Sequence, residues 1–278
     1  MRLDRATLAV LFLFSAGIPA MAGTATLIGV EEDTGDFYAI STADASIQLI
    51  GHSGVTGLGT LEFNSRDGFF YGFTTGAAPV LYKFSIPASL DAVTPQSIGP
   101  LGLFAYEGAL AFAPDGTAYA LNAGVTVPSL FTIDLDTGQA TVVNSMIQRH
   151  DIAGLGWRSD GVLIGLDSTD NALLEIDPTT ASATTIDSIM PIIGGIGGMA
   201  LLPNDAGYFV TGGPLAVNPG SNELYSFDAL TGEHFFIGSF EDLIVGTGFS
   251  GLSVVPEPAT LVLLVMGVAS VLGRKPNR

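Results

Sequence analysis

The sequence predicts an all-β fold assembled from five similar units of four short strands. Three observations support this prediction. Asp-Gly turns recur at a regular spacing, one short β-forming segment recurs five times, and the first and last copies of the repeat are incomplete in complementary ways. A repeat of this length built from strands is typical of β-propeller blades, and it does not fit helical or leucine-rich repeats.

The clearest copy of the repeat spans residues 108–144 and contains four candidate strands, which we call a, b, c and d in chain order. GALAF and TAYAL flank the turn Pro114-Asp115-Gly116, and LFTID and ATVV flank the turn Asp136-Thr137-Gly138. Asp and Gly tolerate the backbone angles of tight turns. Each pair of segments is therefore expected to form a hairpin.

The other copies follow the same pattern. The turn between strands a and b recurs at Asp67, Asp115, Asp160 and Asp205, so that the aspartates are 48, 45 and 45 residues apart. Strand c recurs five times, as DFYAI, LYKF, LFTI, LLEI and LYSF, and strand a recurs five times, as GTLEF, GALAF, GLGW, GMALL and SGLSV. A propeller blade has a period of about 40 to 50 residues.

The two ends of the repeat series complement each other. The first copy supplies strands b, c and d in LIGV, FYAI and IQLI, and the last copy stops after strand a at Val254. One blade is therefore expected to form from both chain ends. Such closure removes the exposed sheet edges that an open array would leave. The sequence predicts a five-bladed propeller of four-stranded blades over residues 23–255.

Residues 1–22 predict a secretory signal peptide. Arg2 and Arg5 precede the apolar run 8–14, and Ala20-Met21-Ala22 forms a small-x-small cleavage site before Gly23. An amino-terminal membrane anchor would need about 20 apolar residues, and this run is shorter. We therefore expect export by the Sec machinery, and cleavage by signal peptidase between the Ala20-Met21-Ala22 motif and Gly23.

The propeller region is strongly acidic, with four Lys or Arg against 25 Asp or Glu. This charge excludes nucleic acid as a partner, because nothing could neutralise a run of phosphates. Solubility outside the cell is the simplest explanation. The alternative is Ca²⁺, because Glu31-Glu32-Asp33 with Asp36 offers oxygen ligands. Residues 134–138 begin like a calcium loop but lack its later ligands, so we interpret them as a hairpin turn and expect no cofactor.

The loops from strand d to strand a and from strand b to strand c are where propellers usually bind their ligands. The candidate binding residues in or beside these loops are His52, Glu107, Arg149, His150, Asp151, Glu241 and Asp242. A His beside a carboxylate could act as an acid or base. However, His234 falls on the other face, and no nucleophile motif or metal-binding pair of histidines occurs. Trp157 takes the place of Phe112 in its repeat and is expected in the core.

These observations favour a non-catalytic binding propeller over an enzyme. The main alternative is a secreted polysaccharide lyase or hydrolase, with Glu107, His150 and Asp151 as its acid and base groups. The second alternative is a structural module that depends on a bound cation. The chain has no cysteine, so its stability comes from blade packing and closure and not from disulfides.

The carboxyl terminus, residues 256–278, carries the most specific motif. Pro256-Glu257-Pro258 precedes an apolar segment, and a basic end follows from Arg274 to Arg278. In this order and spacing the segment resembles the PEP-CTERM sorting tail of exported bacterial proteins. The resemblance implies recognition near Pro256 to Pro258 by an exosortase, followed by release or attachment at the surface. Hosts of such tails typically have an outer membrane and make exopolysaccharide.

The apolar segment 259–273 has 15 residues. As a helix it would be about 22 Å long, shorter than a hydrocarbon core of about 30 Å. We therefore expect this short transmembrane segment to tether the protein transiently in the inner membrane, before it reaches the cell surface or the extracellular matrix. The basic end favours the cytoplasmic side, and a permanent tail anchor is the alternative. The expected ligand is exopolysaccharide or an envelope partner.

Overall fold

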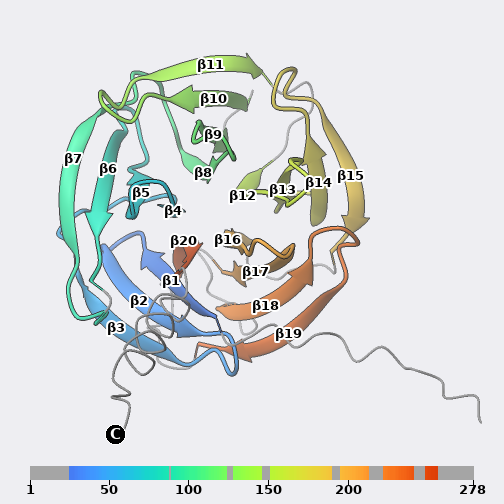
Figure 1. The fold of residues 1–278 in the computed structure, drawn as a ribbon, viewed down its shortest axis with the longest axis horizontal. Coiled ribbons are helices and arrows are strands. Elements are labelled where there is room, and N and C mark those ends of the chain that lie inside the picture. Colours follow the sequence, from blue (N-terminus) through green and yellow to red (C-terminus); the bar gives the residue numbers. More distant parts are fainter. Residues whose placement is uncertain are drawn as a thin grey trace, which may run out of the picture.

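In the part of the chain that the structure describes, twenty strands form five four-stranded sheets that stand around a central axis like the blades of a propeller (Figure 1). The structure is a computed structural model, and it describes residues 25–87, 89–123, 128–145, 151–189, 195–212, 222–240 and 248–255. The expected signal peptide (1–22) and sorting tail (256–278, with its segment 259–273) lie outside these residues. In the described part of the chain, no helix has the length and apolar character that crossing a membrane requires. The predicted all-β, five-bladed fold is confirmed.

Four blades are formed by consecutive strands. Blade 1 contains β4 (Glu62–Asn64), β5 (Phe69–Phe73), β6 (Val80–Ser85) and β7 (Thr94–Pro100). Blade 2 contains β8 (Glu107–Phe112), β9 (Ala118–Ala123), β10 (Ser129–Ile133) and β11 (Ala140–Ser145). Blade 3 contains β12 (Ile152–Trp157), β13 (Leu163–Asp167), β14 (Ala172–Ile176) and β15 (Ala183–Ser188). Blade 4 contains β16 (Ile196–Leu201), β17 (Ala206–Thr211), β18 (Glu223–Asp228) and β19 (His234–Ser239).

The fifth blade joins the two ends of the propeller. It contains β20 (Phe249–Val254), β1 (Thr26–Glu31), β2 (Asp36–Ser41) and β3 (Ile47–His52), in that order across the sheet. Figure 1 shows the red strand β20 beside the blue strand β1 near the axis. Two buried serines of β20 also bind blade 1: the Ser250 hydroxyl donates to the carbonyl of Leu58, and the Ser253 Oγ accepts the amide of Phe63 at 2.9 Å. The predicted closure by both chain ends is confirmed.

A bulge recurs between strands c and d of every blade. The register shifts lie at Phe37/Tyr38, Leu81/Tyr82, Leu130/Phe131, Leu173/Leu174 and Leu224/Tyr225. A bulge bends its strand and increases the local right-handed twist. The repeated bulge therefore gives all five blades a similar twist at their outer edge, which lets neighbouring blades pack face to face.

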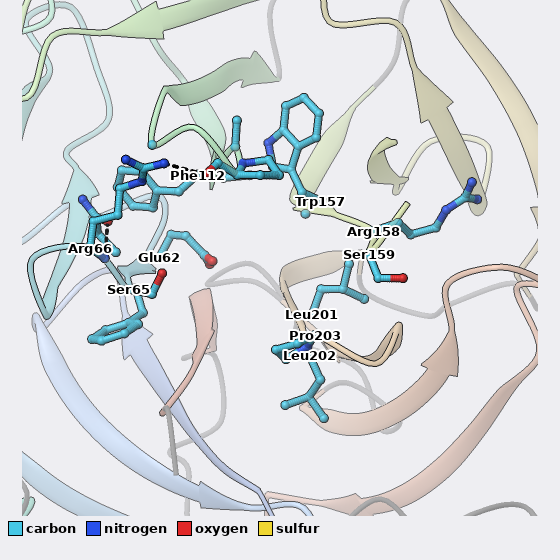
Figure 2. A pocket seen from close by; sticks show the side chains of 17 residues that line it. Glu62, Ser65, Arg66, Phe112, Trp157, Arg158, Ser159, Leu201, Leu202 and Pro203 are labelled. Atoms are coloured by element: carbon cyan, nitrogen blue, oxygen red, sulfur yellow. Dashed lines mark hydrogen bonds between the residues drawn. The ribbon is translucent and has the colours of Figure 1, made fainter. Parts of the chain in front are cut away.

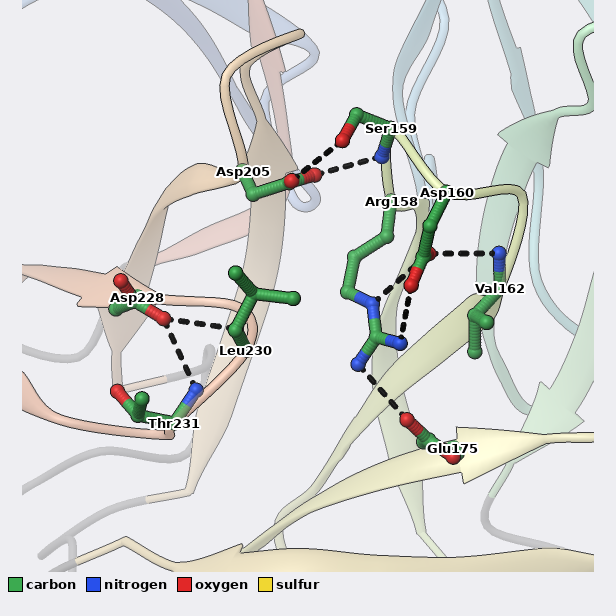
Figure 3. A network of polar contacts seen from close by, with 9 residues as sticks. All are labelled: Arg158, Ser159, Asp160, Val162, Glu175, Asp205, Asp228, Leu230 and Thr231. Carbon is green, nitrogen blue, oxygen red and sulfur yellow. Dashed lines mark hydrogen bonds and ion pairs between the residues drawn. The ribbon is translucent and has the colours of Figure 1, made fainter.

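Aspartates close the turns between strands c and d. The Oδ1 atom of Asp134, of Asp177 and of Asp228 each accepts two backbone amides of its own turn, and Figure 3 shows the Asp228 example. These backbone hydrogen bonds lower the pKa of Asp134 and Asp177. Residues 134–138 thus form the hairpin turn that the sequence predicts. Part of the acidity of the chain serves turn formation.

Among the described residues, the apolar core is divided into five clusters, each lying between two neighbouring blades. Trp157 belongs to the cluster between blades 2 and 3, where its ring meets Tyr119 edge-on with ring centroids 5.5 Å apart. Its indole Nε1 is buried and makes no hydrogen bond to any described residue, so packing alone orients the ring. Trp157 thus packs against the core, as expected, but its ring is only half-buried.

Glycines allow the innermost strands to approach one another at the axis. A Cβ on Gly154 would lie 2.3 Å from the Cβ of Met199, and a Cβ on Gly251 would lie 2.5 Å from the backbone nitrogen of Leu61 in the next blade. Real Cβ atoms are not found this close to other atoms, so any larger residue would push the blades apart. The ring closes because these positions are glycine.

We predict that Gly251→Ala lowers the free energy of unfolding by about 1 to 3 kcal/mol, because the added methyl group meets backbone that cannot move aside. Urea denaturation of the purified protein would measure this loss. Gly51→Ala is the matched control, because a Cβ at Gly51 has no neighbour closer than 3.6 Å. Equal stability of the two variants would contradict the proposed crowding at the axis.

Candidate functional site

Strand a of every blade runs along the central channel. One mouth of the channel therefore lies where these strands begin, and the other lies where they end. At one mouth, where the chain enters strand a, a pocket of about 50 Å³ is lined by Glu32, Gly59, Glu107, Ala153, Gly197 and Ser250, among others. We call this end the acidic mouth. Below it the channel narrows between the innermost strands, where Leu61, Leu110, Leu155, Met199 and Leu252 are among the lining residues, and leaves no room for a water molecule. The opposite end, at the turns between strands a and b, is therefore a separate site, which we call the turn mouth.

Two carboxyl groups meet at the acidic mouth. Glu107 is the first residue of β8, and Asp151 directly precedes β12, so adjacent innermost strands bring the two side chains together. The two carboxyl groups lie close enough to interact with each other. Partial burial and the Asp151 carboxylate raise the pKa of Glu107 to about 7, and Glu32 contributes to the same shift. Near neutral pH Glu107 is therefore partly protonated and can donate a hydrogen bond.

Buried polar groups hold Asp151 in place. The Ser168 hydroxyl donates to Oδ2 of Asp151 at 3.1 Å. The backbone amide of Asp151 donates to Oδ1 of Asp167 at 3.2 Å. Asp167 is fully buried and also accepts the amide of Thr169 at 2.9 Å. Backbone amides stabilise a buried carboxylate, which in turn fixes the strand end that carries Asp151. The pair at the acidic mouth is thus built into the framework of blade 3.

The acidic cluster that suggested Ca²⁺ is dispersed in the structure. Glu32 Oε1 accepts the Thr75 hydroxyl at 2.9 Å, and burial raises the pKa of Glu32. Glu31 is buried, and its Oε2 accepts the Thr34 hydroxyl at 2.8 Å. Among the described residues, no group of three or more His, Cys, Asp or Glu is arranged to hold a metal ion.

Of the remaining candidates, the structure describes only His52, which does not join the acidic mouth. His52 ends β3, the outermost strand of its blade (Figure 1), is exposed, and has Nδ1 3.0 Å from Oδ1 of Asp36. Arg149, His150, Glu241 and Asp242 lie outside the described residues. The structure thus brings together Glu107 and Asp151 and adds Glu32, which the sequence analysis considered only as a metal ligand.

The turn mouth holds a larger pocket, of about 480 Å³, that the sequence analysis did not find. The side chains that matter for its chemistry are Glu62, Arg66, Phe112, Trp157, Ser159 and Leu201 (Figure 2). They lie at the end of strand a or in the following turn of blades 1 to 4. Blade 5 has no such turn, because its strand a is β20, the last strand of the propeller.

Glu62 is the acidic group of the turn mouth. It lies in β4, is half-buried, and Figure 2 shows its side chain reaching toward the middle of the pocket. Burial raises the pKa of Glu62 well above its ordinary value, although a hydrogen bond with Ser253 partly offsets the shift. Glu62 therefore keeps its proton to higher pH than an exposed glutamate does.

Hydrogen bonds between neighbouring blades fix the rim of the turn mouth. Arg66 Nη2 donates to the carbonyl of Pro114 at 2.6 Å, which joins blades 1 and 2. The amide and the hydroxyl of Ser159 both donate to the Asp205 carboxylate at 2.6 Å, which joins blades 3 and 4 (Figure 3). Such links hold the pocket in shape before any ligand arrives.

A buried arginine supports one side of this rim. Arg158 is 8% exposed, and its guanidinium binds both carboxylate oxygens of Asp160, at 3.1 and 2.7 Å, and Oε1 of Glu175 at 2.8 Å (Figure 3). Two carboxylates thus balance its charge. Arg158 therefore acts as a brace between the turn and β14, and its guanidinium is not available to a ligand.

We predict that Glu107 makes stability depend on pH. Its folded-state pKa of about 7 exceeds the ordinary value of 4.5, so its stabilising contribution is complete below pH 4.5 and is lost as pH rises through 7. Glu107→Gln removes this titration. The melting temperature of the variant minus that of the unmodified protein should increase by roughly 2 to 4 °C from pH 5 to pH 8, after allowance for solvent screening.

Asp115→Asn is the control for this measurement. Asp115 is exposed, and hydrogen bonds with Thr117 lower its pKa, so it stays ionised from pH 5 to pH 8. Its variant should keep a constant difference from the unmodified protein over that range. A constant difference for Glu107→Gln as well would show that the Glu107 proton is not retained in the folded state.

Solved structures share this fold at low sequence identity. A structural genomics protein of unknown function from Bacteroides thetaiotaomicron matches with a TM-score of 0.52 and 14% identity, over 77% of this chain and only 58% of its own. A chain in the crystal structure of a nidogen/laminin complex matches with a TM-score of 0.55 and 11% identity, over 83% of this chain and 98% of its own. At this identity the likeness shows the fold alone. No curated protein matches the sequence.

The sequence of much of the propeller matches the profile of one protein family. Its profile, described as a repeat of unknown function (DUF6923), matches residues 30–213. The match begins in β1 and ends directly after β17, so it covers three whole blades and parts of the other two. Because the match extends over more than half of the sequence, this chain belongs to the DUF6923 family.

Proposed function

We propose that the protein is an exported, non-catalytic binding propeller of the cell surface or extracellular matrix. In this proposal the signal peptide 1–22 directs export, an exosortase processes the PEP-CTERM tail near Pro256 to Pro258, and the propeller holds exopolysaccharide or another envelope component. The fold is consistent with such a role, since a similar propeller occurs in a solved complex of two proteins. The structure of the acidic mouth favours binding over catalysis.

The observation that carries this proposal is the close approach of the Glu107 and Asp151 carboxyl groups, which meet at the ends of adjacent innermost strands and raise the pKa of Glu107. In most glycoside hydrolases the two catalytic carboxyl groups stand about 5 to 9.5 Å apart, because the scissile bond or a water molecule must fit between them. Carboxyl groups that approach this closely leave no such space. The pocket beside them, of about 50 Å³, is also too small for a sugar ring.

Mass spectrometry of the protein from its native host tests the export and sorting steps. We expect a mature chain that starts at Gly23 and ends near Pro256 to Pro258, recovered from the cell surface or the medium. A chain that still ends at Arg278 and stays in the membrane fraction would overturn the sorting step. Co-sedimentation of the mature protein with exopolysaccharide of the same host tests the binding role.

One observation favours a second candidate function, a polysaccharide lyase or hydrolase. A pKa of about 7 suits Glu107 to general acid catalysis near neutral pH. If the binding role is correct, the purified protein releases no new chain ends from host exopolysaccharide. An enzyme would show turnover that Glu107→Gln reduces by roughly 10²-fold or more while the circular dichroism spectrum stays unchanged.

A further inference from the structure

The turn mouth has the size of a ligand site. Its volume of about 480 Å³ lies within the range of about 300 to 1,000 Å³ that small-molecule pockets occupy. It opens on the channel axis, where turns of four blades converge. The hydrogen bonds of Arg66 with Pro114 and of Ser159 with Asp205 fix these turns to one another. The pocket therefore exists without a ligand.

One wall of the pocket is aromatic. Phe112 and Trp157 end the innermost strands of blades 2 and 3, and both are half-buried and line the pocket. Each ring is held edge-on by a tyrosine, Phe112 by Tyr71 and Trp157 by Tyr119, with centroids 5.5 Å apart in both pairs. Rigid aromatic rings offer a negatively polarised face to the C–H groups of a ligand.

Polar groups border this aromatic wall in the turns of blades 1 and 3, and Leu201, Leu202 and Pro203 of blade 4 lie across from it (Figure 2). Glu62 reaches into the pocket from β4, and the exposed residues Ser65 and Ser159 place hydroxyl groups on its rim. Arg66 adds guanidinium donors beside Pro114. An aromatic wall bordered by hydroxyl and carboxyl groups matches a ligand with one C–H face and an edge of hydroxyl groups. A pyranose ring has this form.

The charges of the pocket favour a neutral ligand. The described residues contain three basic side chains, Arg66, Lys83 and Arg158, and the charge of Arg158 is balanced by Asp160 and Glu175. Arg66 alone then remains at the pocket to attract an anion. The surrounding propeller has four basic residues against 25 acidic ones, so its field repels anionic ligands.

We infer that the turn mouth is a carbohydrate site that holds a neutral pyranose unit against Phe112 and Trp157, with its hydroxyl groups bound by Glu62, Ser159 and Arg66. This inference rests on the binding role proposed above and assigns that role to the turn mouth. It places the sugar at the end of the channel opposite the loops on which the sequence analysis concentrated.

The protein carries its own probe for this site, because Trp157 is the single tryptophan of the chain. Its fluorescence should change saturably when the mature protein is titrated with the methyl glycosides of glucose, galactose or mannose. Concentrations up to about 50 mM suffice, because they cover dissociation constants in the millimolar range. Methyl glucuronide, a sugar of the same size with a negative charge, tests the preference for neutral ligands.

Two variants test the polar groups of the pocket. Glu62→Gln keeps the shape but changes the hydrogen bonding, and should weaken binding of the neutral glycoside about tenfold. Ser65→Gln adds bulk on the exposed rim without touching the core and should weaken binding as well. The matched control is Phe236→Ala, which removes an exposed aromatic ring from a groove of about 500 Å³ between β3 and β19, remote from the channel. This variant should bind like the unmodified protein.

Three results of the glycoside titrations would overturn the inference. These are no saturable change with any neutral glycoside, tighter binding of the glucuronide than of all neutral glycosides, and loss of binding in Phe236→Ala but not in Glu62→Gln. The proposed function is tested separately by co-sedimentation with host exopolysaccharide. If Glu62→Gln and Ser65→Gln co-sediment as well as the unmodified protein, the assigned site fails and the function stands. If the unmodified protein binds glycosides but does not co-sediment, the function fails and the site stands.

Discussion

The close approach of the five innermost strands at the axis is the constraint on which the structure depends. Where Gly154, Gly198 and Gly251 face neighbouring strands, an added Cβ would lie less than 3 Å from atoms of the next blade. This contact closes the ring and narrows the channel below the acidic mouth, where it leaves no room for a water molecule. A channel closed at its middle cannot conduct a ligand from one face to the other. The two mouths are therefore independent sites with different chemistry.

The repeat made the fold predictable from sequence, because every blade contains the same turns and the same alternation of apolar residues. The 45- to 48-residue spacing, the turn at Asp134 and the pairing of β20 with β1 all follow from local patterns that the structure reproduces. The distance of His52 from the axis could not be predicted from such local patterns. The loop of His52 faces the predicted side, but strand d is the outermost strand, so the side chain lies far from the axis. Distance from the axis depends on strand order within the blade.

The site residues were harder to predict, yet the repeat contains a signal for them. If the innermost strands are aligned on Leu61, Leu110, Leu155, Met199 and Leu252, one position contains Glu62 where the other blades have Ala111, Gly156, Ala200 and Ser253. Another position contains Glu107 where the other blades have Leu58, Ile152, Ile196 and Phe249. A carboxylate in an otherwise small or apolar position is costly unless it is partnered. Burial then raises the pKa of both groups.

The direction of β20 connects the turn mouth with the proposed sorting tail. β20 runs from Phe249 and Ser250, at the acidic mouth, to Val254, which aligns with Phe112 and Trp157 at the turn mouth. The chain therefore leaves the propeller on the face that holds the larger pocket. If the tail tethers the protein in the inner membrane, this face is directed toward the bilayer, and bulky glycans have restricted access to it. Cleavage near Pro256 would remove this restriction, so processing of the tail and exposure of the pocket would be a single event.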